Sequence, residues 1–244
     1  GLVRLAESEW LATDPALGPR GATFDAHPEA VQVLPEARAA EAELCDMLGV
    51  NGGIEQAARA HWEDFCILTQ DAPGAPYRLT AAAVAFPTDW QLPEKMGKPI
   101  ADVHDPIDFY AEQLSAGVDR FLEGLRAPHI FGRTNAFVMP NGLWRYLHAD
   151  DPAERYAHVT PDNAGQTLYV RCERETLRRL PKSQGIVFTI GVHVAPLGSL
   201  SDAGVARIAE TLHGFGAGEG DRRAAPHYAH ALSAYAKTRQ RKAA

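Results

Sequence analysis

The stretch from Arg171 to Pro181 constrains the fold of this chain more than any other segment. It reads Arg-Cys-Glu-Arg-Glu-Thr-Leu-Arg-Arg-Leu-Pro, and an apolar run from Gly185 to Ile190 follows it at once. Charges set so closely against an apolar strand are not typical of a solvated tail. The pattern therefore predicts either that this segment grips something or that two rows of charges pair with each other.

Composition narrows the class of protein. The chain has 244 residues, of which 45% are hydrophobic, so it can bury the core of one large domain or of a domain with helical additions. The formal net charge is -7, and the positive residues are dispersed apart from Arg171–Arg179 and the tail 237–242. We therefore expect no nucleic-acid partner, because the basic footprint of such proteins is missing.

The cysteines and the apolar segments indicate in which cellular compartment the protein is expected. Cys45, Cys66 and Cys172 have neither the even count nor the spacing of a disulfide framework, and there is no Cys-x-x-Cys pair. No apolar stretch is long enough to cross a bilayer. We expect a cytoplasmic protein with no membrane partner.

Several helices are predicted from apolar spacing and cap residues. One covers Leu34–Leu48 and stops at Gly49; a second runs from Ile54 to about Leu68 with Trp62 and Phe65 on one stripe. Together they predict an N-terminal helical cap. Later helices are expected at 110–125, from Ser201 or Asp202 to Gly214, and at 227–237.

Strands are predicted where side chains alternate. They cover 77–86, 134–139, 143–147 across a Pro140–Gly142 turn, 167–173 and 185–194. In the first, Leu79, Ala81, Ala83 and Ala85 would share one shallow face. Such a face suits a flat ligand or the close packing of a helix, and the sequence leaves both open.

This order of elements predicts an α+β fold, a mixed sheet with helices mainly on one face. We expect three parts: an N-terminal helical extension at 1–70, a core at 71–215, and a linker with a C-terminal helix and tail at 216–244. Ten histidines compete for any metal site.

Alternation along 167–173 brings three candidate catalytic side chains to one face, those of Tyr169, Arg171 and Glu173, together with Thr167. Glu173 could bind a cationic amine, and Tyr169 or Arg171 could donate a proton. Equally, Arg171 and Glu173 could form a network that ties the strand to the loop before Pro181. Arg133 and Asn135, two residues apart, would share a face if extended.

Five segments occur in the order found in one known family. They are Glu63-Asp64-Phe65, Leu79-Thr80-Ala81 with Phe86-Pro87-Thr88-Asp89-Trp90, Lys95–His104, Arg133-Thr134-Asn135 and Arg171–Pro181. The chain resembles the haem-dependent oxidative N-demethylase family from about Trp10 to about Leu212. It departs from that pattern at Trp62, at Ala136, where the family usually has Trp, and at Glu175, where Gln is usual.

The resemblance implies a PAS-like core that binds haem b. It makes His104 the first candidate for the iron ligand, with Asp105 accepting its other ring proton; the alternative is a loop histidine that caps the next helix. His193 and His148 are reserves, although a structural role is the simpler one for both. Arg133, Asn135 and Arg178 are expected at the propionates or the substrate, and Arg178 and Arg179 in a short turn.

The implied activity is oxidative: haem and O2 would oxidise an N-methyl carbon of a small amine. NADPH, FMN and an iron–sulfur centre are expected on a separate reductase, because the chain has no nucleotide fingerprint. Ala136 predicts either room for a bulkier amine or an altered oxidation of the amine. The alternatives are a PAS sensor or carrier module without catalysis, and a scaffold subunit that has lost haem.

Overall fold

The computed structural model describes residues 1–12, 17–103, 115–147, 151–215 and 218–243. The described residues form one seven-stranded sheet in the order β1-β5-β6-β7-β3-β4-β2. Its strands are β1 (Val3–Leu5), β2 (Val31–Val33), β3 (Asp64–Thr69), β4 (Arg78–Ala83), β5 (Ile130–Met139), β6 (Tyr169–Arg179) and β7 (Ile186–Pro196). β1–β5, β2–β4, β3–β4 and β3–β7 pair in antiparallel registers. The predicted α+β class is confirmed.

The chain divides into two compact units. The sheet unit comprises Gly1–Asn135, Arg145–Leu147 and Glu173–Val192, and the helical unit comprises Ala136–Trp144, His148–Cys172 and His193–Ala244. Strands β5, β6 and β7 contribute residues to both. The predicted division into an extension, a core and a C-terminal part at residues 70 and 215 stays a prediction.

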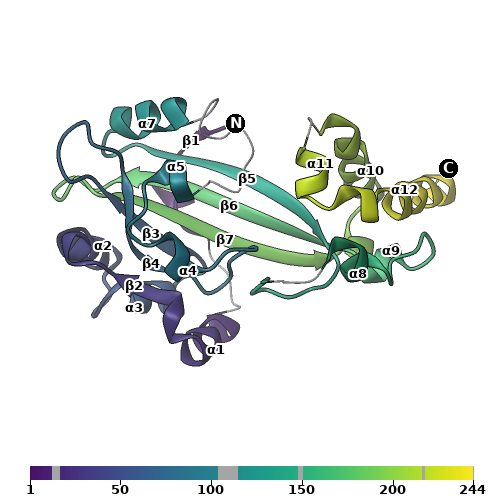
Figure 1. The fold of residues 1–244 in the computed structure, drawn as a ribbon, viewed down its shortest axis with the longest axis horizontal. Coiled ribbons are helices and arrows are strands. Elements are labelled where there is room, and N and C mark those ends of the chain that lie inside the picture. Colours follow the sequence, from purple (N-terminus) through teal and green to yellow (C-terminus); the bar gives the residue numbers. More distant parts are fainter. Residues whose placement is uncertain (13–16, 104–114, 148–150, 216–217, 244) are drawn as a thin grey trace. The chain divides into compact units, whose positions relative to one another are not determined.

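Short helices belong to the sheet unit. They are α1 (Leu17–Ala26), α2 (Arg38–Leu48), α3 (Ile54–Ala60), α4 (Leu92–Lys95), α5 (Ile100–Val103) and α7 (Ser115–Gly124). In Figure 1, α1, α2 and α3 gather beside β2, β3 and β4. The helix predicted at Leu34–Leu48 is confirmed as a 3₁₀ turn followed by α2, which ends at Gly49 in the left-handed region with φ 65°.

Helices cover both faces of the sheet in this unit, not mainly one. On one face, Leu92, Ile100 and Leu122 from α4, α5 and α7 share a buried cluster with Ala82 of β4 and with Val84, which follows the strand. On the other, α3 packs against β3 and β4. The contacts of α3 with β4 favour helix packing as the reason for the alanines of this strand.

A β-bulge in β4 changes which side chains share a face. Ile67 pairs with Ala81 and Leu68 with Leu79, so Thr80 is the extra residue. As a result Leu79 lies in the same cluster as Ala82, rather than with Ala81 and Ala83 as simple alternation predicts.

The first 70 residues of the chain are less helical than predicted. β1, β2 and β3 all fall within residues 1–70, and the helix expected to reach Leu68 ends at Ala60. Strand β3 replaces its second half because Asp64–Leu68 are buried on both faces, and short apolar runs of this kind do not distinguish a helix from a central strand.

Strand β6 carries the charged motif for its whole length. Arg178 and Arg179 lie in the strand and not in a turn, which corrects the sequence-based expectation. The turn from β6 to β7 is held by Glu43 of α2, whose carboxylate accepts hydrogen bonds from Lys182 N (2.8 Å) and Ser183 N (2.6 Å). Burial opposes ionisation of Glu43, but these hydrogen bonds lower its pKa overall.

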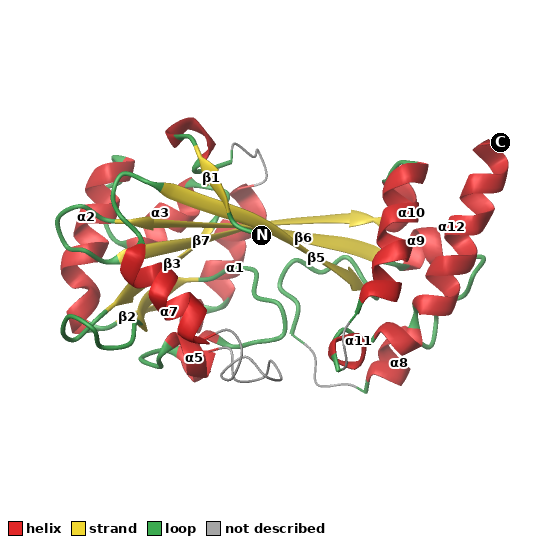
Figure 2. Ribbon diagram, turned by 90° about the horizontal axis from the view of Figure 1, so that it is seen from above, coloured by secondary structure: helices red, strands yellow, loops and turns green. Residues whose placement is uncertain are grey.

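The helical unit has a core of its own. Its helices, drawn in Figure 2, are α8 (Pro152–Tyr156), α9 (Ala164–Thr167), α10 (Asp202–Thr211), α11 (Glu219–Arg222) and α12 (Ala229–Ala243). Leu168, Leu197, Val205, Tyr228 and Leu232 are among its buried members. Ser201 caps α10 by accepting a hydrogen bond from Gly204 N at 3.1 Å, and the helices predicted at 201–214 and 227–237 are confirmed.

Two predicted strand segments are wrong. Residues 143–147 form no hairpin with β5; instead Tyr146 makes an isolated parallel bridge with Thr88. Thr167 lies in α9, so it does not extend the row of Tyr169, Arg171 and Glu173. No helix within the described residues is both long and apolar enough to span a membrane.

Candidate functional site

The candidate site is built around two carboxylates on the odd-numbered side of β6. Glu173 and Glu175 are two residues apart on one strand and therefore share a face. Glu175 pairs with Arg133 of β5, and Glu173 accepts a hydrogen bond from the Thr88 hydroxyl at 2.5 Å. We call Glu173 and Glu175 the carboxylate row.

Burial dominates the electrostatics of Glu175. Its residue is 7% exposed, and loss of water raises the pKa of its carboxyl group more than the bond and charge of Arg133 lower it. The nearby charge of Glu173 raises that pKa further. Arg133 is less enclosed, with 51% of its side chain exposed.

The loop that carries Thr88 is held at several points. Asp89 has a positive φ of 61°, a conformation that Asp tolerates better than most residues. Asp89 N donates to Tyr146 O at 2.7 Å, and Tyr146 N donates to Pro87 O at 3.0 Å. Thr88 therefore meets Glu173 from a fixed backbone.

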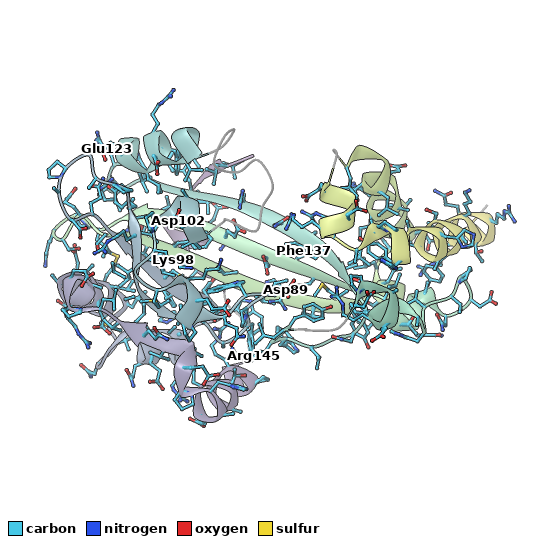
Figure 3. All side chains as sticks on the ribbon, in the orientation of Figure 1. Asp89, Lys98, Asp102, Glu123, Phe137 and Arg145 are labelled. Carbon is cyan, nitrogen blue, oxygen red and sulfur yellow. The ribbon has the colours of Figure 1, made fainter. Side chains whose placement is uncertain are left out.

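An apolar rim lies on the same face of the sheet. Leu177 follows Glu173 and Glu175 in the odd-numbered row, and it packs against the buried cluster under α4, α5 and α7. The rim consists of partly buried Trp90, Met96, Val103, Phe121, Phe131, Leu177 and Phe188. Phe121 and Phe131 meet edge to face with ring centroids 5.4 Å apart. Figure 3 labels Asp102 of α5 and Lys98, which precedes that helix.

Arg179 closes the far end of the odd-numbered row and is used by the fold. Its guanidinium donates to Leu122 O (2.6 Å), Leu125 O (2.7 Å), Gln184 O (2.9 Å) and the Tyr77 hydroxyl (2.7 Å). These bonds tie the end of α7 to β6. These bonds use four of the five N–H donors of a guanidinium, so Arg179 serves the fold first.

The even-numbered side of β6 grips the N-terminal segment. Arg178, predicted at a propionate, donates to Glu7 Oε1 at 2.7 Å, and its Cζ lies 4.0 Å from the centre of the Trp10 ring. Arg174 donates to the carbonyl oxygens of Glu9 and Trp10. The charged motif thus grips residues 7–10 with one side and pairs charges on the other, so both interpretations of its pattern hold, one on each face.

Tyr169 and Arg171 belong to the helical unit, whereas Glu173 belongs to the sheet unit. Arg171 is fully buried and donates to Trp144 O at 2.7 Å. The Tyr169 ring lies so close to Gly142 that a Cβ there would stand 2.7 Å from its Cε1 atom. The three predicted catalytic residues all lie on β6, and their convergence on one substrate stays a prediction.

The predicted iron ligand lies outside the described residues, as do Asp105 and the reserve His148. His193, the other reserve, is an exposed residue of β7 in the helical unit. Asn135 is half-buried on β5, two residues after Arg133. Their assignments to haem stay predictions.

The described cysteines do not fit thiolate ligation. Burial raises the pKa of the Cys66 thiol far above its ordinary value, and the nearby Asp64 charge raises it further. Cys172 is partly buried against the apolar core of the helical unit. Both behave as small apolar side chains.

The sheet unit contains side chains of the two kinds that a porphyrin needs. Within the described residues, no group of three His, Cys, Asp or Glu side chains could hold a metal ion. A porphyrin supplies most of the iron's ligands itself and needs an apolar slot and cations for its propionates. The apolar rim and the half-exposed Arg133 fit those needs.

Sequence reasoning missed Thr88 and the contribution of Glu175. Thr88 is 85 residues from Glu173, so no local pattern could pair them. Glu175 was recognisable in principle, because it follows Glu173 by two residues on a strand.

These features define an α+β protein whose sheet presents paired carboxylates beside an apolar rim. A family model, described as haem-dependent oxidative N-demethylase, alpha subunit-like, matches residues 51–233. The chain belongs to this family. The match takes in β3 to β7 and thus every residue of the carboxylate row and the apolar rim.

Proposed function

We propose that this chain is the haem-carrying subunit of an oxygenase that removes an N-methyl group from a small amine. The observation that carries the proposal is the carboxylate row beside an apolar rim on one face of the sheet. Membership of the N-demethylase family supports it. The amine would lose a methyl carbon as formaldehyde, while O2 and a pair of electrons yield water.

Glu173 is the proposed anchor for the substrate cation. Its carboxylate accepts from the Thr88 hydroxyl, which fixes its orientation, and a carboxylate is a strong acceptor for an ammonium N–H. Glu175 is less suited to this role, because Arg133 balances its charge and burial favours its protonated form. The row therefore offers one anionic anchor and one neutral or paired neighbour.

Further roles follow from the resemblance and are proposals. Bound haem b would supply oxygen activation at its iron, held by His104 with His193 as the alternative. Arg133 and Asn135 would contact propionates, with Arg178 available only if it left Glu7. Tyr169 or Arg171 would donate a proton near the substrate.

The source of electrons is proposed to be a separate reductase with NADPH, FMN and an iron–sulfur centre. The alpha-subunit-like description of the family is consistent with a partner chain. Ala136, whose carbonyl accepts from Arg223 Nη1 at 2.7 Å, stands where the resemblance leads one to expect Trp. Its small side chain supports a substrate bulkier than dimethylamine.

The test is to express the chain with haem supplied and to record ferric, ferrous and carbonyl absorption spectra. Formaldehyde is then measured with a surrogate electron donor across secondary and tertiary methylamines of rising size. We expect a haem spectrum, turnover, and its loss in His104→Ala but not in His27→Ala, an exposed control. Haem binding with no turnover of any amine would favour the carrier module, and no haem binding the scaffold subunit.

A further inference from the structure

We propose that Arg20 and Asp64 are positioning residues for the candidate site, because their buried ion pair sets the loop that presents Thr88 to Glu173. This inference rests on the proposed function only in assigning Glu173 to the amine. The loop in question covers residues 85–89. All the groups involved belong to the sheet unit.

The ion pair is completely enclosed. Arg20 of α1 is 0% exposed and Asp64 of β3 is 1% exposed, and the Arg20 guanidinium donates to both Asp64 Oδ1 and the carbonyl oxygen of Trp62. Its Cζ lies 4.7 Å from the centre of the Phe86 ring and 5.6 Å from that of Trp62. A buried ion pair is costly unless further hydrogen bonds satisfy it.

Asp64 transmits the position of Arg20 to the backbone of the loop. Its Oδ1 accepts from Ala85 N at 2.7 Å and its Oδ2 from Phe86 N at 3.1 Å. These are the last two amides before Pro87, whose ring fixes φ and has no N–H. The Asp64 carboxylate therefore fixes both the position and the orientation of the backbone just after β4.

The other end of the loop is fixed independently. Figure 3 labels Asp89 and Arg145, which mark the two segments that pair there, and the bonds between Asp89, Pro87 and Tyr146 close the loop. Thr88 lies between the two fixed points. Its hydroxyl reaches Glu173 across 85 residues of sequence only because both ends are held.

Stability alone does not require this arrangement. Well-packed apolar residues often replace a buried ion pair without loss of stability. What they could not replace is the carboxylate that accepts from two particular amides and so fixes the position of the loop backbone. Arg20 also stacks on Phe86 itself, so the same side chain contacts the loop directly and through Asp64. Lysine could supply the charge but neither the planar stacking nor the paired donors.

The first test measures the conformation of the loop in the absence of haem and substrate. The γ2-methyl resonance of Thr88 is followed in ligand-free protein for wild type, Arg20→Lys, Asp64→Asn and Phe86→Leu. The matched control is Arg59→Lys, because Arg59 holds α1 through Gly21 O (3.1 Å) and Asp25 (2.7 Å) without touching the loop. We expect the chemical shift of the Thr88 methyl group to change in Arg20→Lys, Asp64→Asn and Phe86→Leu. In the control Arg59→Lys it should stay at the wild-type value.

The second test asks whether the pair acts through Thr88. Arg20→Lys is expected to weaken binding of a methylamine about fivefold, the effect of one hydrogen bond, and less than twofold in a Thr88→Val background. Equal losses in both backgrounds, or a Thr88 resonance that moves as much in Arg59→Lys, would overturn the inference. Should wild type bind no amine, the proposed function fails while the methyl test still decides this point. Phe86→Leu keeps the backbone bonds, so it serves if the charge variants do not fold.

Discussion

The two sides of strand β6 in the sheet unit use similar residues for opposite purposes. On the even-numbered side, Arg174 and Arg178 are bound to residues 7–10, and Thr176 pairs with Thr189 at 2.6 Å. On the odd-numbered side, Glu173 and Glu175 meet Thr88 and the half-exposed Arg133. A charged side chain thus acquires a structural or a functional role from what packs on its face, not from its type.

The largest effect should come from breaking the odd-numbered side. Glu173→Gln removes the proposed anchor for the ammonium ion, and truncating one partner of a charge pair costs about 3 kcal/mol, roughly 100-fold. We expect kcat/KM for amine oxidation, measured as formaldehyde release, to fall by that factor. The matched control is Glu7→Gln on the even-numbered side, where turnover should change less than about twofold. Equal losses in both variants would remove the distinction between the faces.

The even-numbered side should respond in stability instead. Arg178→Met removes the stacking on Trp10 and the pairing with Glu7, whose side chain is 65% exposed and so contributes little. We expect the free energy of unfolding, measured in urea, to fall by about 1–2 kcal/mol, with amine affinity unchanged. Arg120→Met, at an exposed position of α7, is the control and should be near neutral. A loss of affinity without loss of stability would place Arg178 at the ligand after all.

Glu63, just before β3, should make the stability of the fold depend on pH. It is fully buried, and loss of water raises the pKa of its carboxyl above the ordinary 4.5, although the bond from Ala12 N opposes this. As pH rises from 4.5 to the raised pKa, the unfolded chain releases this proton first, so the folded state loses stability.

Glu63→Gln keeps an oxygen acceptor for Ala12 N and cannot ionise. We expect urea unfolding to show wild type losing stability relative to Glu63→Gln as pH rises above about 5, by up to about 1.4 kcal/mol per unit of pKa shift. Parallel pH profiles of the two proteins would mean that Glu63 titrates normally.

The smallest effect concerns the threonine pair under the even-numbered side. Thr176→Val leaves the buried Thr189 hydroxyl without its partner and should cost about 1 kcal/mol of unfolding free energy. Replacing both threonines by valine should restore part of that loss, because no hydroxyl remains unsatisfied. Thermal unfolding of the single and double variants measures the difference. A double variant less stable than the sum of the singles would contradict it.

Sequence reasoning succeeded where local signals decide the structure. The apolar spacing of α2 with Gly49 at its end, the Ser201 cap of α10 and the apolar run of β7 each fix an element within a few residues. It failed where distant packing decides. The Pro140–Gly142 turn does not begin a hairpin, because residue Tyr146 finds its partner at Thr88, far away in the sequence.

For the candidate site, too, the sequence predicts the local features but not the distant contacts. Alternation places Glu173 on a strand face and predicts which neighbours share it. Nothing local predicts that Thr88 reaches Glu173, or that Arg20 reaches Asp64, since 85 and 44 residues separate these partners. Such contacts follow from the order of strands in the sheet, which local spacing does not encode.

The extra residue at Thr80 has a consequence for how much length variation the sheet tolerates. Without Thr80, Leu79 and Tyr77 would stand two and four positions before Ala82 in an unbroken pleat, so both would keep the face that they share with Ala82 now. Arg179 would still reach the Tyr77 hydroxyl, and the apolar cluster under α7 would keep both large side chains. Deleting this single threonine should therefore cost the hydrogen bonds that Thr80 makes with Thr69, Ile67 O and Leu34 N but leave the faces of the strand unchanged, whereas deleting Arg78 would turn Tyr77 to the opposite face.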